Sequence, residues 1–487
     1  MEPVTRVLDA QPVPDLDTYR RHGGGAALRV VTEGGGDAVL AVIEASGLRG
    51  RGGAGFPTAT KWRSVIDHRP QDLPLTVVVN AAEGEPGSFK DRAIIRTNPY
   101  RVLEGAMVAA LTVGADEVVV ATKARFATEV ARLREAAAEM AAARWAPGVS
   151  VEVVEGPAEY LYGEETALLE VVEGRLPFPR IAPPWRRGLD ETADDTAAAA
   201  GTEMASAGTG SLPALVNNVE TLANVALIVA NGPDWFREVG TAESPGTIVC
   251  TITGHMQRAG VVEVAMGTPL RTVIESVGGR PRVGEVVAAM SGVSNPLLPA
   301  SLLDTPLSYE AMTEVGSGLG TGGFIVFDSS VDLVAVAQGA SRFLAVESCG
   351  QCTPCKQDGV AVAEALDRLR SGGTTSDLVA VQDRLGTIDV GARCFLATQH
   401  QLVVGSVLRL FADQFEGHID GRLDPAAQYV IAEMEDLVEG VDGPEAVYDD
   451  AHVEKQPDWS YDPEDSGQAP ADRLDQEAGE TDVSDGP

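Results

Sequence analysis

Residues 47–57 read GLRGRGGAGFP and are followed closely by Lys61 and Trp62. The run contains the glycines Gly50, Gly52, Gly53 and Gly55. Glycines at this density let the backbone bend tightly and let a ligand approach the N–H groups directly. Arg49 and Arg51 add positive charge, although the whole chain carries a formal net charge of -35. The run therefore predicts an anion site, and phosphate is the anion that such loops typically hold.

From Gly50 to Gly55 the run matches the dinucleotide-binding pattern G-x-G-x-x-G. That pattern requires a strand before the glycines. Here residues 37–46, DAVLAVIEAS, are typical of a short helix that ends at Gly47. We therefore expect a phosphate-binding loop of a different build, with a flexible surface loop as the alternative.

Short runs of branched apolar residues follow the glycine run and predict the strands of a parallel sheet. They lie at residues 75–79, 117–121 and 149–154, with a long helix expected over 126–144. Strands that alternate with helices indicate a doubly wound, Rossmann-like α/β domain. Asn80, Glu83 and Glu85 follow the first strand. Sheets of this kind bind their ligands at the carboxyl ends of the strands, so these side chains are candidates for a ligand site.

The remaining pattern divides the chain into further parts. Residues 246–328 contain short strands and turns, which predict a small β-rich module. Residues 335–435 repeat apolar positions at helical spacing and predict an antiparallel helical bundle. Residues 1–240 then form the α/β domain, with a solvated insertion at 187–211. The acidic residues 440–487 are expected to be a disordered tail.

The composition limits the class of protein. Asp and Glu number 72 against 37 Lys and Arg, which argues against nucleic acid or an anionic membrane surface as a partner. The first residues lack the pattern of a secretory signal, and no apolar run has the length of a membrane span. Five cysteines are too few for the disulfide framework of a secreted protein of this size. These features predict a cytoplasmic protein.

Cysteines make the strongest chemical signal, in the segment ESCGQCTPCK at residues 347–356. Cys349, Cys352 and Cys355 have the spacing that wraps three corners of a 4Fe–4S cluster, whose fourth ligand commonly comes from elsewhere in the chain. Cys394 is the expected fourth ligand, because Cys250 lies in a strand pattern typical of a buried thiol. A structural zinc site and unliganded core thiols are the alternatives. The six histidines are scattered and are expected at the surface or at helix caps.

The two candidate sites together indicate a redox function. An iron–sulfur cluster accepts single electrons, whereas a nicotinamide delivers a hydride, and a flavin exchanges with both. A phosphate-binding α/β cleft in the same chain as a cluster therefore predicts a flavin-dependent oxidoreductase.

Five motifs follow one another between about residues 40 and 435: GLRGRGGAGFPTATKW, NAAEGEPGSFKDR, YLYGEETALLE, PALVNNVETLANV and ESCGQCTPC. In this order they closely resemble the NADH-oxidising flavoprotein subunit of respiratory complex I, the F-like family of NADH-quinone oxidoreductase subunits. The same module recurs as the diaphorase subunit of NAD-linked hydrogenases and formate dehydrogenases. The resemblance implies FMN, NAD(H) and a 4Fe–4S cluster as cofactors. It also implies a ubiquitin-like β-grasp (SLBB) fold for residues 246–328.

The resemblance further implies a set of site residues. Contacts to FMN and NADH are expected from Gly50, Arg51, Gly52, Gly53, Gly55, Phe56, Lys61, Asn80, Glu83, Glu85, Tyr160, Gly163, Glu164, Glu165, Asn217, Asn218 and Thr221. Catalytic roles are implied for Glu83, Glu85 and Glu165, and ligation of the cluster for Cys349, Cys352, Cys355 and Cys394.

Several positions depart from the family pattern. Ala82 stands where the family usually has Asp, and Tyr162 where it usually has Cys. Ala182 replaces a common Lys, and Trp185, which is able to stack on adenine, replaces a common Phe. These changes leave the exact NADH contacts open, but not the flavin or the cluster.

Three functional interpretations follow from the resemblance. The first is the electron-input subunit of a complex I, whose partners are a thioredoxin-like 2Fe–2S subunit and a larger iron–sulfur subunit at the inner face of a membrane. The second is the diaphorase subunit of a soluble hydrogenase or formate dehydrogenase. The third is a non-catalytic assembly or sensor protein that keeps the cluster. The sequence does not identify the final electron acceptor.

Overall fold

The computed structural model describes residues 4–68, 73–180 and 213–457, so the expected insertion at 187–211, with Ala182 and Trp185, lies outside the described residues. Branched apolar residues build the first sheet, in which four parallel strands lie in the order β3-β2-β1-β4. The strands are β1 (Thr76–Ala81), β2 (Glu117–Lys123), β3 (Ser150–Gly156) and β4 (Ala214–Asn218). In this register Asn80 at the carboxyl end of β1 pairs with Asn218 at the end of β4.

Helices cover both faces of this sheet. Val77, Val79 and Val118 point into a core shared with the larger group of helices, whereas Val78 and Val119 pack with the helix α8 on the other face. The helices of this part are α1 (Leu16–Arg21), α2 (Ala26–Gly34), α3 (Gly36–Ser46), α4 (Thr58–His68), α5 (Lys90–Thr97), α6 (Pro99–Val113), α7 (Ala127–Ala142), η1 (Tyr160–Gly163), α8 (Glu165–Val172), α10 (Val219–Asn231) and α11 (Pro233–Arg237). The helix expected before the glycine run is α3, and Gly47 ends it in the left-handed conformation with φ 71°.

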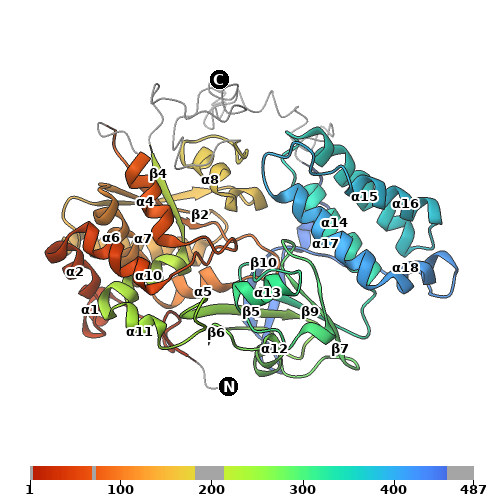
Figure 1. Cartoon of the computed structure of the whole chain (residues 1–487), viewed down its shortest axis with the longest axis horizontal. Helices are drawn as coiled ribbons and strands as arrows, with labels where there is room; N and C mark the ends of the chain where they lie inside the picture. Colours follow the sequence, from red (N-terminus) through yellow and green to blue (C-terminus); the bar gives the residue numbers. More distant parts are fainter. Residues whose placement is uncertain (1–3, 69–72, 181–212, 458–487) are drawn as a thin grey trace, which may run out of the picture.

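The β-rich module has its own five-stranded sheet in the order β6-β5-β9-β7-β8. Its elements are β5 (Thr247–Gly254), β6 (Gly260–Ala265), α12 (Leu270–Gly278), β7 (Val286–Ser291), β8 (Leu298–Pro299), η4 (Ala300–Leu302), α13 (Tyr309–Glu314) and β9 (Gly323–Asp328). Cys250 lies in β5 and is fully buried. Figure 1 shows this module in green below the parallel sheet.

The bundle consists of α14 (Leu333–Val346), α15 (Thr353–Arg370), α16 (Thr375–Leu385), α17 (Leu396–Leu410) and α18 (Ala412–Ile419). It forms the blue-green part at the right of Figure 1. The predicted fold class, an α/β domain with a parallel sheet followed by a β module and a helical bundle, is therefore confirmed. No helix of the described residues combines the length and the apolar character that crossing a membrane requires.

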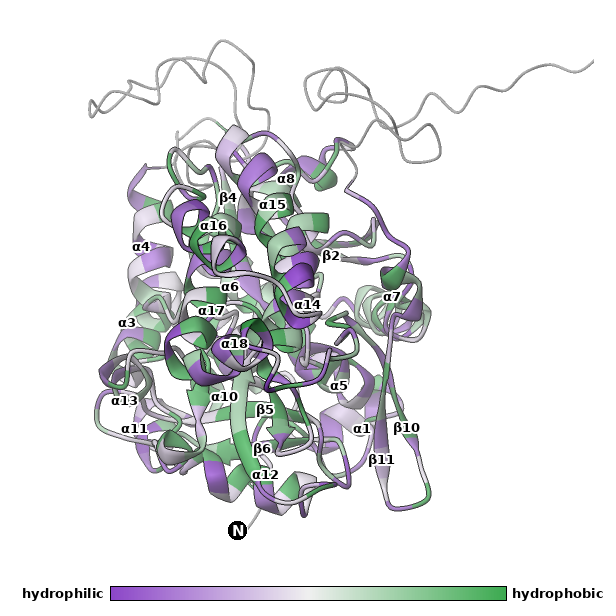
Figure 2. Ribbon diagram, turned by 90° about the vertical axis from the view of Figure 1, so that its right-hand side faces the viewer, coloured by the Kyte–Doolittle hydropathy of each residue, from purple (hydrophilic) through white to green (hydrophobic). Residues whose placement is uncertain are grey.

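The expectation of a disordered tail from residue 440 does not hold for residues 440–457. The strands β10 (Met434–Glu439) and β11 (Pro444–Tyr448) form an antiparallel hairpin, and the 3-10 helix η5 (Asp450–Val453) follows it. Figure 2 shows the hairpin as a two-stranded ribbon at one edge of the molecule. Composition alone missed this ordered segment because its carboxylates have distant basic partners. Asp436 in the hairpin forms an ion pair with Arg96, and Asp449, which caps η5, forms one with Arg125. Residues 458–487 lie outside the described part of the chain.

The expectation that the histidines lie at the surface or at helix caps is wrong for three of them. His400, His418 and His452 are buried. Each has a polar partner on another segment: Ser341 for His400, Asp332 for His418 and Glu347 for His452. Partners this distant in sequence leave no local pattern, so the sequence did not reveal them. His22, by contrast, ends α1 as expected.

Candidate functional site

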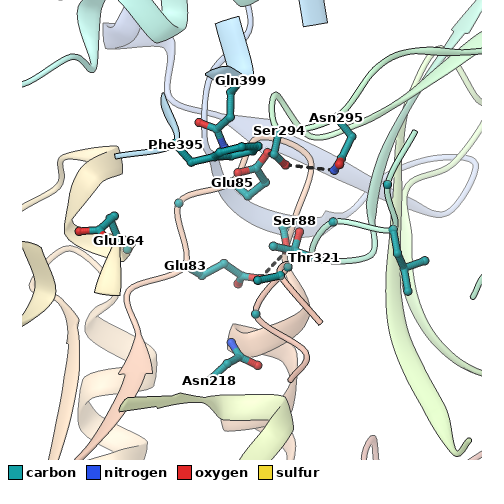
Figure 3. Close-up of a pocket in the computed structure, with 18 of the residues that line it drawn as sticks. Glu83, Glu85, Ser88, Glu164, Asn218, Ser294, Asn295, Thr321, Phe395 and Gln399 are labelled. Atoms are coloured by element: carbon teal, nitrogen blue, oxygen red, sulfur yellow. Dashed lines mark hydrogen bonds between the residues drawn. The ribbon is translucent and has the colours of Figure 1, made fainter. Parts of the chain in front are cut away.

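A cavity of about 640 Å³ lies where the three parts of the fold meet. The carboxyl ends of β1 and β4, the glycine run, η1, the loops of the β module and the start of α17 all line it. Figure 3 shows Glu83 and Asn218 toward one end of the cavity and Phe395 and Gln399 at the other. The predicted site residues that line it are Gly52, Gly53, Asn80, Glu83, Glu85, Tyr160, Gly163, Glu164 and Asn218.

The glycine run folds back on itself at the mouth of this cavity. Gly50 N donates to Phe56 O at 2.8 Å, and Arg49 Nε donates to Gly55 O at 2.7 Å. Gly53 has φ 118°, a conformation that a residue with a side chain rarely adopts. Gly52, Gly53 and Ala54 line the cavity, and the glycines leave their backbone N–H groups open to close approach by a ligand. Such a loop, with the Arg49 side chain beside it, fits a phosphate group.

Arg51 does not line the cavity, although the sequence predicted a cofactor contact there. Its side chain is only 2% exposed and donates to the carbonyls of Thr247 and Pro245, at 3.1 and 3.2 Å. Its backbone N–H donates to Thr221 Oγ1 at 2.8 Å. The structure therefore uses Arg51 to fix the glycine run in two directions: its backbone N–H holds the run to Thr221 of α10, and its side chain holds it to Thr247 of β5.

The other predicted contacts lie behind or beside the cavity wall. Gly50, Gly55, Phe56, Lys61, Glu165 and Asn217 are outside the set of lining residues. Lys61 forms an ion pair with Glu165, and Trp62 Nε1 donates to Asn217 Oδ1 at 2.8 Å. Phe56 is 50% exposed. An aromatic side chain at this exposure beside the glycine run is available to a bound ligand.

A buried charge cluster that the sequence analysis did not single out lies under the cavity floor. Lys90 Nζ contacts Asp91 at 2.6 Å and Glu220 at 3.0 Å. Asn218 Nδ2 donates to Asp91 Oδ2 at 2.6 Å. Burial raises the pKa of Asp91 to about 6, although the Lys90 ammonium opposes that shift. Lys90 and Asp91 belong to the quoted motif NAAEGEPGSFKDR, and a charged pair beside a predicted ligand loop was a usable signal.

Glu83 and Glu85 lie in one loop but have opposite electrostatic environments. Burial disfavours the charged form of Glu83, but Arg92 and Lys90 outweigh it, and the pKa of Glu83 is lowered. Burial raises the pKa of Glu85, even though this carboxyl group accepts hydrogen bonds from Tyr160 Oη at 2.6 Å and Val293 N at 2.7 Å. Two carboxyl groups whose pKa values move apart are suited to different roles, one as a fixed anion and one as a proton carrier.

Phe395 and Gln399 are lining residues that the sequence analysis missed. Phe395 is 56% exposed at the edge of the cavity, and Gln399 Nε2 donates to Tyr160 Oη at 3.1 Å. Both follow Cys394 closely in the chain, so proximity to a predicted ligand was the signal available. From the β module, Ser294, Asn295 and Thr321 also line the cavity, and no local pattern marked them.

The four predicted cluster ligands converge on a second, smaller hollow. Cys349, Cys352, Cys355 and Cys394 all line it. Hydrogen-bond donors face the sulfur atoms, since Arg393 N lies 3.4 Å from Cys352 Sγ and Gln351 Nε2 lies 3.5 Å from Cys349 Sγ. No three His, Cys, Asp or Glu side chains of the described residues meet as ligands of a single metal ion would. The thiols instead surround a space, which fits a polynuclear cluster.

The pKa values of these thiols also fit a site that binds a metal centre. Burial raises the pKa of the Cys355 thiol to about 11 and also raises the pKa values of Cys349 and Cys394. Thiols in such surroundings become thiolates at neutral pH when a metal centre binds them.

The two hollows share a wall. Leu161, Cys394 and Leu396 line both the larger cavity and the thiol-lined hollow. A ligand in the cavity and a cluster between the cysteines would therefore be in adjacent sites. Electrons pass readily between groups that are this close.

Three family models match the chain. The Nuo51 FMN-binding domain matches residues 43–227, the SLBB domain residues 249–293, and the NADH-ubiquinone oxidoreductase-F iron-sulfur binding region residues 335–418. One of the NADH-quinone oxidoreductase F subunits of Rhizobium meliloti, designated F 2, is 35% identical over 439 residues, covering 87% of this chain and 99% of the relative. The NADH-quinone oxidoreductase F subunit of Streptomyces coelicolor is 35% identical over 426 residues, covering 84% of this chain and 90% of the relative.

A solved structure is similar as well. An NAD+-reducing [NiFe]-hydrogenase in the H2-reduced state aligns with a TM-score of 0.73 and 32% sequence identity. The alignment covers 86% of this chain and 67% of the hydrogenase chain.

Proposed function

Because the chain belongs to the F family of NADH-quinone oxidoreductase subunits, we propose that its 640 Å³ cavity holds FMN with NADH against it and that its four cysteines hold the 4Fe–4S cluster. The chain is an NADH oxidoreductase with an FMN-binding domain and a 4Fe–4S-binding region. The observation that carries the proposed site is the wall of Leu161, Cys394 and Leu396 that the two hollows share.

FMN held in the cavity would supply the chemistry that links a two-electron hydride donor such as NADH to one-electron acceptors. The backbone of Gly52 and Gly53 and the Arg49 guanidinium would hold its phosphate. Glu83 stays ionised between Arg92 and Lys90, which fixes the floor of the cavity. Glu85 holds a proton more readily than an exposed glutamate, and Tyr160 orients its carboxyl group.

Partner subunits complete the proposed function. The relatives are named as F subunits of an NADH-quinone oxidoreductase, so the chain works within a larger assembly. We place a thioredoxin-like 2Fe–2S subunit and a larger iron–sulfur subunit against it, with the assembly peripheral to the inner face of a membrane. The similarity to an NAD+-reducing [NiFe]-hydrogenase supports a second candidate, the diaphorase subunit of a soluble hydrogenase.

Substitution of Gly53 tests the proposed FMN site. Gly53→Val places a branched side chain at a left-handed residue of the cavity lining, and flavin occupancy is expected to fall about tenfold or more, the effect of losing roughly 1.4 kcal/mol of binding. Gly372→Val is the matched control, because Gly372 also has a positive φ, with open space around it, but lies between α15 and α16. Released flavin is measured by fluorescence and identified by chromatography, and NADH is then added while the visible spectrum is recorded. Stoichiometric flavin in Gly53→Val, or a spectrum of the unsubstituted protein that NADH does not bleach, would refute the proposal.

A further inference from the structure

A segment near the end of the described chain links the α/β domain to the bundle. We call residues 449–455 the C-terminal strap. On one side Asp449 forms an ion pair with Arg125 at 2.8 Å. On the other, Arg342 of α14 donates to the carbonyls of His452, Val453 and Lys455, at 3.0, 2.8 and 2.9 Å. The strap is therefore fixed at both ends by guanidinium groups from different parts of the fold.

The strap places two basic side chains on Glu347, the residue two positions before Cys349. Lys455 Nζ lies 2.6 Å from Glu347 Oε1, and His452 Nε2 lies 3.2 Å from the same oxygen. The other oxygen, Oε2, accepts a hydrogen bond from Tyr160 N at 2.9 Å. The Glu347 side chain is only 4% exposed, and a carboxylate buried to this extent needs such partners to stay charged without a large cost in stability.

A second chain of contacts runs from the strap to the nucleotide cavity. The His452 ring stacks on Phe343 with centroids 5.0 Å apart, and Phe343 meets the edge of Tyr160 at 5.3 Å. Tyr160 in turn donates to Glu85 Oε2 at 2.6 Å, and both residues line the cavity. The strap thus supports Tyr160 twice, at its backbone through Glu347 and at its ring through Phe343.

We propose that the C-terminal strap is a positioning element of the electron-transfer site, in which Lys455 balances the buried charge of Glu347 beside the cluster loop and so sets the reduction potential of the cluster. The inference rests on the proposed function, because it needs the cluster between the four cysteines. A negative charge near an iron–sulfur cluster disfavours its reduced form. Glu347 without Lys455 is therefore expected to lower the potential, and removal of both charges is expected to return it toward the original value.

The test is a redox titration of the purified, cluster-loaded protein followed by EPR of the reduced cluster. Lys455→Met is expected to shift the midpoint potential to a more negative value, whereas Lys455→Arg, which keeps the charge, is expected to leave it near that of the unsubstituted protein. The double variant Glu347→Gln/Lys455→Met is expected to recover most of the shift, which a general loosening of the fold would not do. An unchanged potential in Lys455→Met, or no recovery in the double variant, would overturn the proposal.

A pair of truncations tests the strap as a unit. A chain that ends at Pro457 keeps the strap and is expected to retain the original midpoint potential of the cluster. A chain that ends at Tyr448 lacks the strap, and its midpoint potential is expected to be shifted. Equal potentials in the two truncated chains would also overturn the proposal. Iron and flavin content of the unsubstituted protein are measured first, since absence of either contradicts the proposed function itself and not the role of the strap.

Discussion

Cys394 is the residue at which the two sites of the molecule meet. It lines the thiol hollow together with Cys349, Cys352 and Cys355, and it also lines the larger cavity. The remaining cysteine, Cys250, is fully buried in β5 among apolar side chains of the β module. Four of the five cysteines therefore line one hollow, and the fifth, Cys250, lies in the core of the β module.

Serine substitutions distinguish these two kinds of cysteine. Cys394→Ser is expected to destabilise or convert the cluster, because thiolates hold it directly, and to lower the iron content. Cys250→Ser is the matched control and is expected to keep the full EPR signal, at a stability cost of roughly 1–3 kcal/mol for a buried hydroxyl group. Iron content and low-temperature EPR of both variants show which cysteine holds the cluster. A native signal in Cys394→Ser together with a lost signal in Cys250→Ser would show that the ligand assignment is wrong.

At the scale of elements, His400 ties three helices of the bundle together. It lies on α17, its Nε2 is 2.6 Å from Ser341 Oγ on α14, and its ring faces Gly359 on α15. Burial lowers the pKa of His400 to about 3, so the folded bundle keeps this imidazole neutral. The unfolded chain binds a proton there below about pH 6.5, which makes the folded state less stable as the pH falls.

The pH dependence of stability tests this role of His400. Between pH 6.5 and pH 3 the free energy of unfolding is expected to lose about 1.4 kcal/mol per pH unit from this one histidine. His400→Gln still accepts a hydrogen bond from Ser341 but does not titrate, so the dependence between pH 7.5 and pH 5 should become less steep. Urea titrations followed by circular dichroism at several pH values measure it, with His22→Gln at an exposed position as the control. Equal slopes in His400→Gln and the unsubstituted protein would contradict the prediction.

At the scale of the whole molecule, all three parts contribute to one cavity. The α/β domain supplies the glycine run and the loop of Glu83 and Glu85, the β module supplies Ser294 and Asn295, and the bundle supplies Gln399 with its neighbours. Only five cysteines occur in the chain, enough for one four-cysteine cluster. We therefore expect an electron entry point that passes its electrons to other subunits.

Activity with two acceptors tests the entry-point role. The purified chain with FMN and its cluster is expected to reduce ferricyanide with NADH, because ferricyanide accepts electrons at the surface. Reduction of ubiquinone or menaquinone analogues is expected to be at least about tenfold slower, a difference of about 1.4 kcal/mol in barrier. Addition of the partner subunits should raise the quinone rate alone. Fast quinone reduction by the isolated chain, unchanged by partners, would show that the chain is not limited to electron entry.

Local patterns were sufficient for most strands of the parallel sheet and for the general type of the two sites. Three patterns depend only on residues a few positions apart: the glycine run, the branched apolar runs and the spacing from Cys349 to Cys355. The sequence therefore predicts where the backbone bends freely, where strands form and which cysteines suit a cluster. Local patterns did not reveal the roles of individual side chains. Arg51 looked like a phosphate ligand, but its donors face the carbonyls of Thr247 and Pro245.

The composition also did not predict the ordered hairpin and strap after residue 433. The net charge of an acidic segment does not show where the basic partners of its carboxylates lie. Glu347 meets Lys455 across 108 positions of sequence, and Lys90 of α5 meets Glu220 of α10. A buried charge is stable only when an opposite charge is brought to it, and that pairing exists only once the chain has folded.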